Sequence, residues 1–193
     1  MTKNVVFAAV AAVLAATPMA ASAQSVPGAV IAVVNLERVT NDCNACKTAT
    51  AALRGQITAF QGRQRTLAQP LETEQRAIQT AIDALKGAQP DAALQARARA
   101  FQTRQTDAAQ QLQAEEQRIQ RNRAYIQKQI VDRLNPIYSQ VMQRRGANIM
   151  VETGTTLATA TSVDVTNDVL TALNAALPSI QTTAPAQAAP QGR

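Results

Sequence analysis

Two cysteines, Cys43 and Cys46, are the residues of this sequence whose type and spacing could support covalent chemistry. They form a Cys-x-x-Cys motif that follows an apolar run at residues 30–35 and precedes a long stretch with helical periodicity. A strand that leads into such a motif at the start of a helix is typical of thiol–disulfide exchange proteins. Two interpretations follow: exchange chemistry, or a structural local disulfide or idle thiol pair.

The rest of the composition argues against catalysis. The sequence contains no histidine, so Ser-His-Asp and Cys-His activation of a nucleophile are excluded, together with most zinc sites. A thioredoxin-like enzyme would need a βαβ framework and usually an aromatic residue before the motif, whereas Asp42 stands there. We therefore expect no enzyme, no cofactor and no metal, and for Cys43 and Cys46 we favour a structural local disulfide or an idle thiol pair over exchange chemistry.

The first 23 residues have the pattern of a secretory signal peptide. Lys3 supplies a basic start, residues 5–16 are apolar, and Ala21-Ser22-Ala23 matches the A-x-A cleavage motif. The apolar segment is shorter than the roughly 20 residues that cross a bilayer. We expect cleavage after Ala23 and export to a compartment in which disulfides persist.

Residues 47–145 carry two apolar seams with a period of 3.5 residues. The first seam runs over residues 53–85 and the second, with one stutter, over residues 94–141. Such seams predict an antiparallel helical hairpin whose arms of about 35–40 residues each reach roughly 50–60 Å. Pro136 should bend or break the returning arm near its base, because proline lacks the amide hydrogen that a helix uses.

The turn of this hairpin is expected at residues 86–91, which contain glycine and proline. Folding the chain back there makes facing residue numbers add to 179. Most large apolar residues then face each other and polar residues face polar ones, as at Glu74 and Gln105. Ile57 opposite Asn122 is the poor match in this register.

The segments that flank the hairpin have strand character. Residues 30–35 and 147–152 are two β-branched runs, and Thr153-Gly154 is expected to turn the chain into a third strand at residues 156–161. A short amphipathic helix follows, with Thr166 placed to cap it. The expected fold is α+β, mostly α: a small β-body of about three strands and a C-terminal helix, carrying a long coiled-coil arm.

This body is built from residues 24–46 and 146–177, which are too few for an independent core. We therefore expect strand edges and apolar faces to be covered by copies of the same chain. Residues 178–193 are rich in proline, alanine and glutamine and are expected to be a disordered tail.

Three segments carry a resemblance to a known family: IAVVN at residues 31–35, GANIMV at 146–151 and DVTNDVL at 164–170. With the leader and the hairpin, they make the sequence similar to the Skp/OmpH family of periplasmic chaperones over essentially the whole mature chain except the tail. The resemblance implies a homotrimer whose helical arms enclose a cavity and hold unfolded outer-membrane proteins without ATP.

The hairpin is also basic, with 16 Lys and Arg against 8 Asp and Glu over residues 47–145. One interpretation is a solvated helix face; the other is attraction to acidic clients or an anionic lipid surface. The resemblance adds lipopolysaccharide as a partner of basic residues on the returning arm, and no nucleic acid is expected. The candidate residues are Arg97, Arg99, Arg104, Arg118, Arg121 and Arg123.

Three classes of function therefore remain open. The first is a chaperone that binds unfolded outer-membrane proteins, and the second is a coiled-coil spacer or adaptor of the cell envelope. The third is a thiol–disulfide exchange protein, which the missing βαβ framework disfavours.

Overall fold

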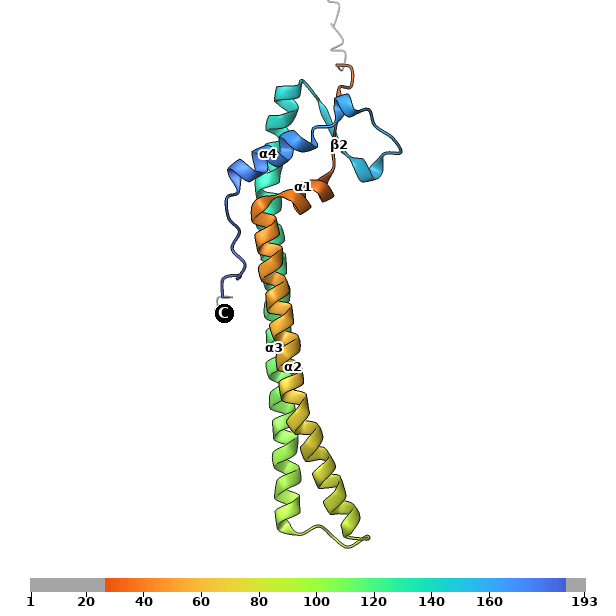
Figure 1. Ribbon diagram of the computed structural model, residues 1–193, viewed down its shortest axis with the longest axis vertical. Coiled ribbons are helices and arrows are strands. Elements are labelled where there is room, and N and C mark those ends of the chain that lie inside the picture. Colours follow the sequence, from red (N-terminus) through yellow and green to blue (C-terminus); the bar gives the residue numbers. More distant parts are fainter. Residues whose placement is uncertain (1–26, 187–193) are drawn as a thin grey trace, which may run out of the picture.

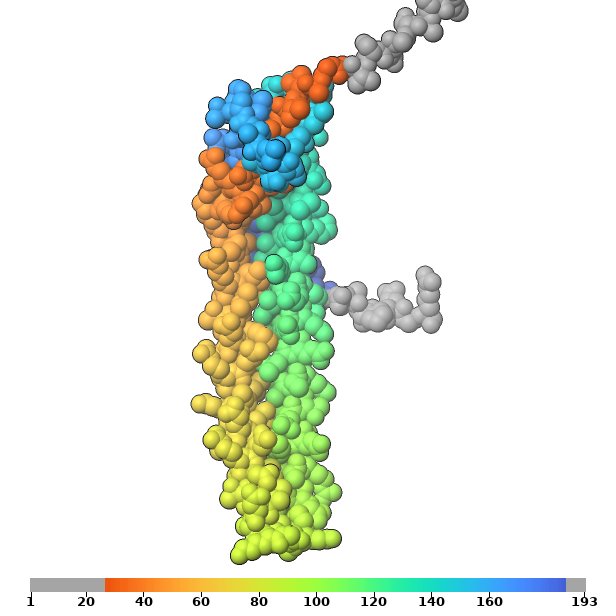
Figure 2. Space-filling model, turned by 90° about the vertical axis from the view of Figure 1, so that its right-hand side faces the viewer, coloured from red at the N-terminus to blue at the C-terminus, as the bar shows by residue number. Residues whose placement is uncertain are grey.

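The computed structural model describes residues 27–186, so the predicted signal peptide of residues 1–23 lies outside the described residues. Two long helices, α2 (Asn44–Ala84) and α3 (Ala92–Arg145), run antiparallel as a projecting arm. A small body sits at one end of this arm (Figure 1). In a view turned by 90° the two helices again lie side by side along the arm (Figure 2), as the predicted hairpin requires.

The turn of the hairpin lies where glycine and proline predict it. After α2 the chain passes through Lys86 and Gly87 with φ of 46° and 92°, and glycine adopts this left-handed region without strain. Asp91 then accepts a hydrogen bond from the backbone N–H of Leu94 at 2.8 Å, which satisfies one free donor at the start of α3. At the other end of α3, Gly146 provides the left-handed C-cap with φ of 65°.

The register of the arm agrees with the predicted register to within one residue. The contacts Arg104–Glu74 and Arg63–Glu115 both join residues whose numbers add to 178. The same sum holds for Asn122 and Gln56, whose side chains are joined by a hydrogen bond of 2.8 Å. The apparent mismatch at Asn122 is thus resolved by the polar residue next to Ile57.

The seam of the arm is thin. Ile78, Ala108, Ile119 and Ile126 are its buried apolar residues, whereas most other seam positions are half-exposed. Two helices bury only one stripe of each other, and here that stripe contains polar layers. The arm is therefore held by less apolar burial per residue than the body.

The expected bend or break at Pro136 is wrong as far as a break is concerned, because α3 continues through it to Arg145. The helix loses one backbone hydrogen bond at the proline. Leu134, Ile137 and Val141 on the same helix are all buried in the core of the body. Their burial stabilises the helical conformation on both sides of Pro136 and offsets that loss.

The body contains a two-stranded parallel sheet formed by β1 (Ile31–Val34) and β2 (Ile149–Glu152). Ile31 pairs with Ile149, and Val34 pairs with Glu152. Helix α1 (Leu36–Asp42) follows β1, and helix α4 (Thr166–Ala176) packs against α1 and α3. The buried cluster at their centre includes Val39, Val141, Val169 and Leu173.

The predicted third strand at residues 156–161 is wrong. After β2 the chain forms a short 3-10 helix at Thr153–Thr155, and a second one at Thr161–Val163 leads into α4. The free edge of β1 is taken by the entry to α4, because Val33 bridges Asp164 and its carbonyl accepts from the backbone N–H of Val165 at 2.8 Å. Within the described residues, the entry to α4 and not residues 156–161 thus pairs with this edge of β1.

The predicted body boundary at residue 146 separates residues that pack together. Leu134, Ile137 and Val141 of the returning arm belong to the same buried cluster as Val34 and Leu173. The base of the arm is therefore part of the body core, and α3 runs without interruption from this core to the tip of the arm.

Candidate functional site

Cys43 and Cys46 are joined by a disulfide at the base of the arm. Cys43 lies between α1 and α2, and its sulfur accepts a hydrogen bond from the backbone N–H of Cys46 at 3.2 Å. The two residues are 0% and 3% exposed and belong to the core cluster of the body. Exchange requires a second thiolate to reach a sulfur atom, so this burial argues against exchange chemistry and favours a structural role.

Reduction of this disulfide should lower stability without altering any binding function. Cross-linking so short a loop stabilises a protein by about 2 kcal/mol in the chain-entropy model. We expect the free energy of unfolding of the Cys43→Ala/Cys46→Ala variant to fall by about that amount. Urea unfolding measures it, with oxidised and reduced wild type as controls; equal stability of all three would contradict a structural disulfide.

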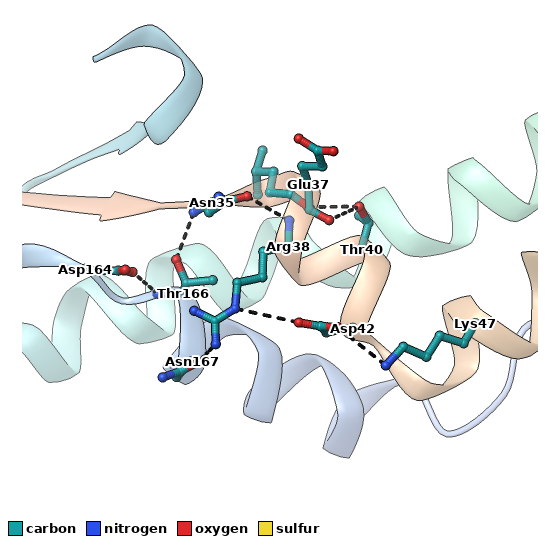
Figure 3. A network of polar contacts seen from close by, with 10 residues as sticks. Asn35, Glu37, Arg38, Thr40, Asp42, Lys47, Asp164, Thr166 and Asn167 are labelled. Atoms are coloured by element: carbon teal, nitrogen blue, oxygen red, sulfur yellow. Dashed lines mark hydrogen bonds and ion pairs between the residues drawn. The ribbon is translucent and has the colours of Figure 1, made fainter. Parts of the chain in front are cut away.

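A polar network ties the end of β1 to the start of α4 (Figure 3). The side chain of Asn35 caps α1 by accepting from the backbone N–H of Arg38 at 2.7 Å. The backbone N–H of Asn35 in turn donates to the Thr166 hydroxyl at 2.9 Å. Arg38 also donates to the Asn167 side chain at 3.0 Å. This network fixes the angle between the sheet and α4.

Thr166 does not cap α4 in the way the sequence predicts. It is the first residue of the helix, and its backbone N–H donates to the Asp164 carboxylate at 2.8 Å. Hydrogen bonds from the Thr166 hydroxyl and backbone N–H hold the pKa of Asp164 below its ordinary value. Asp168 accepts from Arg145 Nε at 2.7 Å, which joins α4 to the end of α3. The Asp-x-Thr-x-Asp motif therefore joins α4 to the rest of the body within one chain.

Loss of the Thr166 hydroxyl should destabilise the body. Thr166→Val keeps the shape of the side chain but leaves the Asn35 N–H without its acceptor, which costs about 1–3 kcal/mol. The exposed Thr171 on the same helix provides the control Thr171→Val, which should change stability little. The measurement is urea unfolding at neutral pH. Equal changes in the free energy of unfolding for the two substitutions would show that the Thr166 hydroxyl does not stabilise the body.

Because the folded-state pKa of Asp164 is lowered, its contribution to stability has a defined pH dependence. The contribution is present above the ordinary pKa of the carboxyl and is lost as pH falls through the folded-state pKa. Without the Thr166 hydroxyl, the largest cause of the shift disappears. The Thr166→Val protein should therefore lose less additional stability than wild type on acidification.

The six candidate arginines all lie on α3 but do not form one site. Arg97 and Arg104 both reach Glu74 across the arm, with N–O distances of 2.9 and 3.2 Å. The hydrogen bond from Arg97 is the main reason why the pKa of Glu74 lies below its ordinary value. Arg118 pairs with Glu115, which also contacts Arg63. Arg97 and Arg104 therefore join α3 to α2, whereas the Arg118–Glu115 pair lies within α3.

The other three candidates, Arg99, Arg121 and Arg123, are exposed and form no ion pair with a residue that the structure describes. They spread along about 36 Å of helix at 1.5 Å per residue. Their arrangement is a dispersed positive charge and not a pocket for one anionic group.

The exposed apolar surface that the sequence predicts for the body is made by residues that sequence reasoning did not name. Val30, Ile31 and Ile149 are 50%, 46% and 42% exposed, and Leu157, in the irregular segment after β2, is 109% exposed. The signal was present, because apolar residues at 30, 31 and 149 exceed what a two-stranded sheet covered on one face can bury. These four residues are called the body patch below.

Comparison with known proteins agrees with this architecture. A family model described as "Outer membrane protein (OmpH-like)" matches residues 30–173. The chain belongs to the OmpH-like family. Its structure is similar to that of a proposed OmpH-like outer membrane chaperone from Caulobacter crescentus CB15, with a TM-score of 0.66 at 17% sequence identity. That similarity covers 81% of this chain and 90% of the other, and at this identity it shows the shared fold.

No curated protein matches the chain. The OmpH-like match contains both strands, the whole arm and the Asp-x-Thr-x-Asp motif, and it ends four residues before the last residue of the core, Leu177. The segment after Leu177 therefore lies outside the matched residues. Within the part of the chain that the structure describes, no helix is long and apolar enough to cross a membrane.

Proposed function

We propose that the protein is an ATP-independent holdase of the periplasm, which binds unfolded outer-membrane proteins and keeps them from aggregating. Membership of the OmpH-like family supports this proposal. The observation that carries it is the arm: two helices of 41 and 54 residues project from a small body and carry an excess of positive charge. A pair of helices this long, with a thin seam, is suited to surround a client and not to form a closed active site.

The proposed active form is a homotrimer assembled through the body. The body patch supports assembly, since exposed aliphatic residues gathered on a body this small are candidates for an interaction surface. The arm supports it too, because α2 and α3 pair with each other within one chain. Three arms extending from one body would enclose a cavity.

The client is held by many weak contacts in this proposal. Large exposed aliphatic residues on the arm are few and scattered, Ile57, Ile82 and Val131 among them. Burial of the client in an apolar groove is therefore not its main source of binding free energy. Distributed charge on several arms gives avidity without a single strong site, and the same charge could attract lipopolysaccharide or an anionic lipid surface.

The proposal predicts that the protein suppresses aggregation of an unfolded outer-membrane protein. A urea-denatured porin is diluted into buffer with one trimer equivalent of the protein, and light scattering is followed without ATP. A holdase should abolish most of the scattering at this ratio. An envelope spacer built from the same hairpin should leave the scattering unchanged, and that result would reject the chaperone proposal.

The same aggregation measurement is repeated with the Cys43→Ala/Cys46→Ala variant. A holdase retains its activity without the cysteines, provided that the variant is folded at the assay temperature. Loss of activity in a folded variant would instead revive the thiol–disulfide exchange interpretation.

A further inference from the structure

Residues 178–186, the described part of the expected disordered tail, follow a defined path in the structure. Residues 178–186 leave the end of α4 and lie against the upper part of the arm (Figure 1). Burial alternates along this segment: Ile180, Thr182 and Ala184 are half-buried, whereas Gln181 and Thr183 are exposed. An alternation of period two is the signature of an extended chain with one face against a surface.

The main contact of this tail is made by Gln129 of α3. The backbone N–H of Gln181 donates to Gln129 Oε1 at 3.0 Å, and Gln129 Nε2 donates to the carbonyl of Gln181 at 2.8 Å. Gln129 Nε2 also donates to the carbonyl of Tyr125 in its own helix at 3.1 Å, which fixes the orientation of the carboxamide. A carboxamide offers one donor group and one acceptor, so Gln129 satisfies both backbone groups of one residue as a neighbouring strand would.

Two further carboxamides continue the contact toward the tip of the arm. Gln56 Nε2 on α2 donates to the carbonyl of Thr182 at 3.2 Å, and the N–H of Ala184 donates to Asn122 Oδ1 at 2.9 Å. The remaining groups of this pair bind each other, with Asn122 Nδ2 donating to Gln56 Oε1 at 2.8 Å. Asn122 is only 3% exposed, so its oxygen needs a partner.

The tail contributes only backbone atoms to these four contacts. Gln56, Asn122 and Gln129, which we name the carboxamide row, therefore do not select for the side chains of what they bind. The single restriction is on the inward face, where the tail places Ile180, Thr182 and Ala184. An apolar or small residue at every second position fits there.

We propose that the carboxamide row is a binding site for an extended polypeptide backbone, and that residues 180–184 occupy it in competition with an extended segment of a client. The strands of outer-membrane barrels alternate apolar and polar residues. In an extended conformation they can therefore place an apolar residue against the arm at every second position. The identity of the client rests on the proposed function, whereas the site itself does not. The covalently attached tail acts at an effective concentration of about millimolar for a short flexible connection, so a client must displace it.

The experiment weakens binding of the attached tail to the carboxamide row and then supplies the tail sequence as a separate peptide. Gln181→Pro in the full chain removes the N–H that Gln129 Oε1 binds, while Thr183→Pro is a matched control whose N–H makes no hydrogen bond within the described residues. The probe is a fluorescent peptide with the sequence of residues 179–186, followed by anisotropy. We expect it to bind Gln181→Pro protein about tenfold more tightly than wild type or Thr183→Pro protein.

Two controls test whether the site binds backbone groups. N-methylation of the probe at the nitrogen of Gln181 should weaken binding about tenfold, whereas N-methylation at Thr183 should not. Adding Gln129→Ala to the Gln181→Pro chain should abolish binding of the probe, whereas adding Gln127→Ala, at an exposed position of the same helix, should leave it unchanged.

Equal affinity of the probe for wild type and the Gln181→Pro protein would overturn the proposal, as would equal loss from the two N-methylated peptides. These outcomes are separate from failure of the chaperone proposal. A protein that does not suppress porin aggregation can still show the peptide results, and a working holdase can lack them.

Discussion

Capture of an unfolded porin should slow sharply when the six candidate arginines are replaced by glutamine. Steering by charge raises association rates by 10- to 1,000-fold at low ionic strength. We expect the wild-type association rate at about 0.05 M salt to exceed the rate at about 0.5 M by tenfold or more, because added salt shortens the Debye length. The variant with all six arginines replaced should associate slowly at both salt concentrations, and each single substitution should have little effect on the association rate.

The ion pairs of the arm provide a control matched in charge. Arg99, Arg121 and Arg123 have no carboxylate partner within the described residues, whereas the other three candidates pair with Glu74 or Glu115. Replacing the unpaired three should slow capture without loosening the arm. Replacing the paired three removes the same charge but also removes contacts between α2 and α3 or within α3, so hydrogen exchange in the arm should increase as well.

Equal association rates in all proteins at both salt concentrations would show that charge does not recruit the client. The scattered aliphatic residues of the arm, such as Ile82 and Val131, would then have to carry the attraction. Measurement by stopped-flow fluorescence of a labelled porin separates these outcomes, because attraction by charge acts on the association rate more than on dissociation.

The arm could be predicted from sequence because its information is periodic. Apolar residues every 3.5 positions determine which face of each helix is buried, and the segment of residues 85–91 between the helices determines the register. The pairing of Asn122 with Gln56 was missed because Gln56 stands one position beside the seam. The long, flexible side chain of Gln56 can contact Asn122 from there. The periodic pattern of apolar residues does not show which neighbouring side chains are long enough to do so.

The body and the tail were harder to predict because their contacts join distant residues. The Thr166 hydroxyl binds the backbone of Asn35 and not its own helix, so the capping rule gave the right residue with the wrong role. Pro136 breaks the local rule for helices, and only burial of residues on either side of it explains the outcome. Residues 178–186 have the composition of a disordered segment, and their order depends on carboxamides contributed by the arm.

If the protein assembles into the proposed trimer, a charge placed in the body patch should dissociate the subunits without unfolding the protomer. Leu157 is 109% exposed in the single chain, so Leu157→Asp removes no contact of the protomer core and should change its stability by less than about 0.5 kcal/mol. In an assembled interface the same carboxylate would lose its water without gaining a partner, and an unpaired charge of this kind is strongly destabilising.

We therefore expect Leu157→Asp to shift the mass in solution from trimer to monomer while circular dichroism and thermal unfolding keep the features of a folded protomer. Leu157→Met retains apolar area and should remain a trimer. Leu173→Ala provides the opposite contrast, since this residue is 0% exposed in the core and its truncation costs about 2–5 kcal/mol of protomer stability. A Leu157→Asp protein that stays trimeric at micromolar concentration would place the interface elsewhere on the body. In that case Val30, Ile31 and Ile149 would be the other exposed aliphatic residues of the body patch able to hold the subunits together.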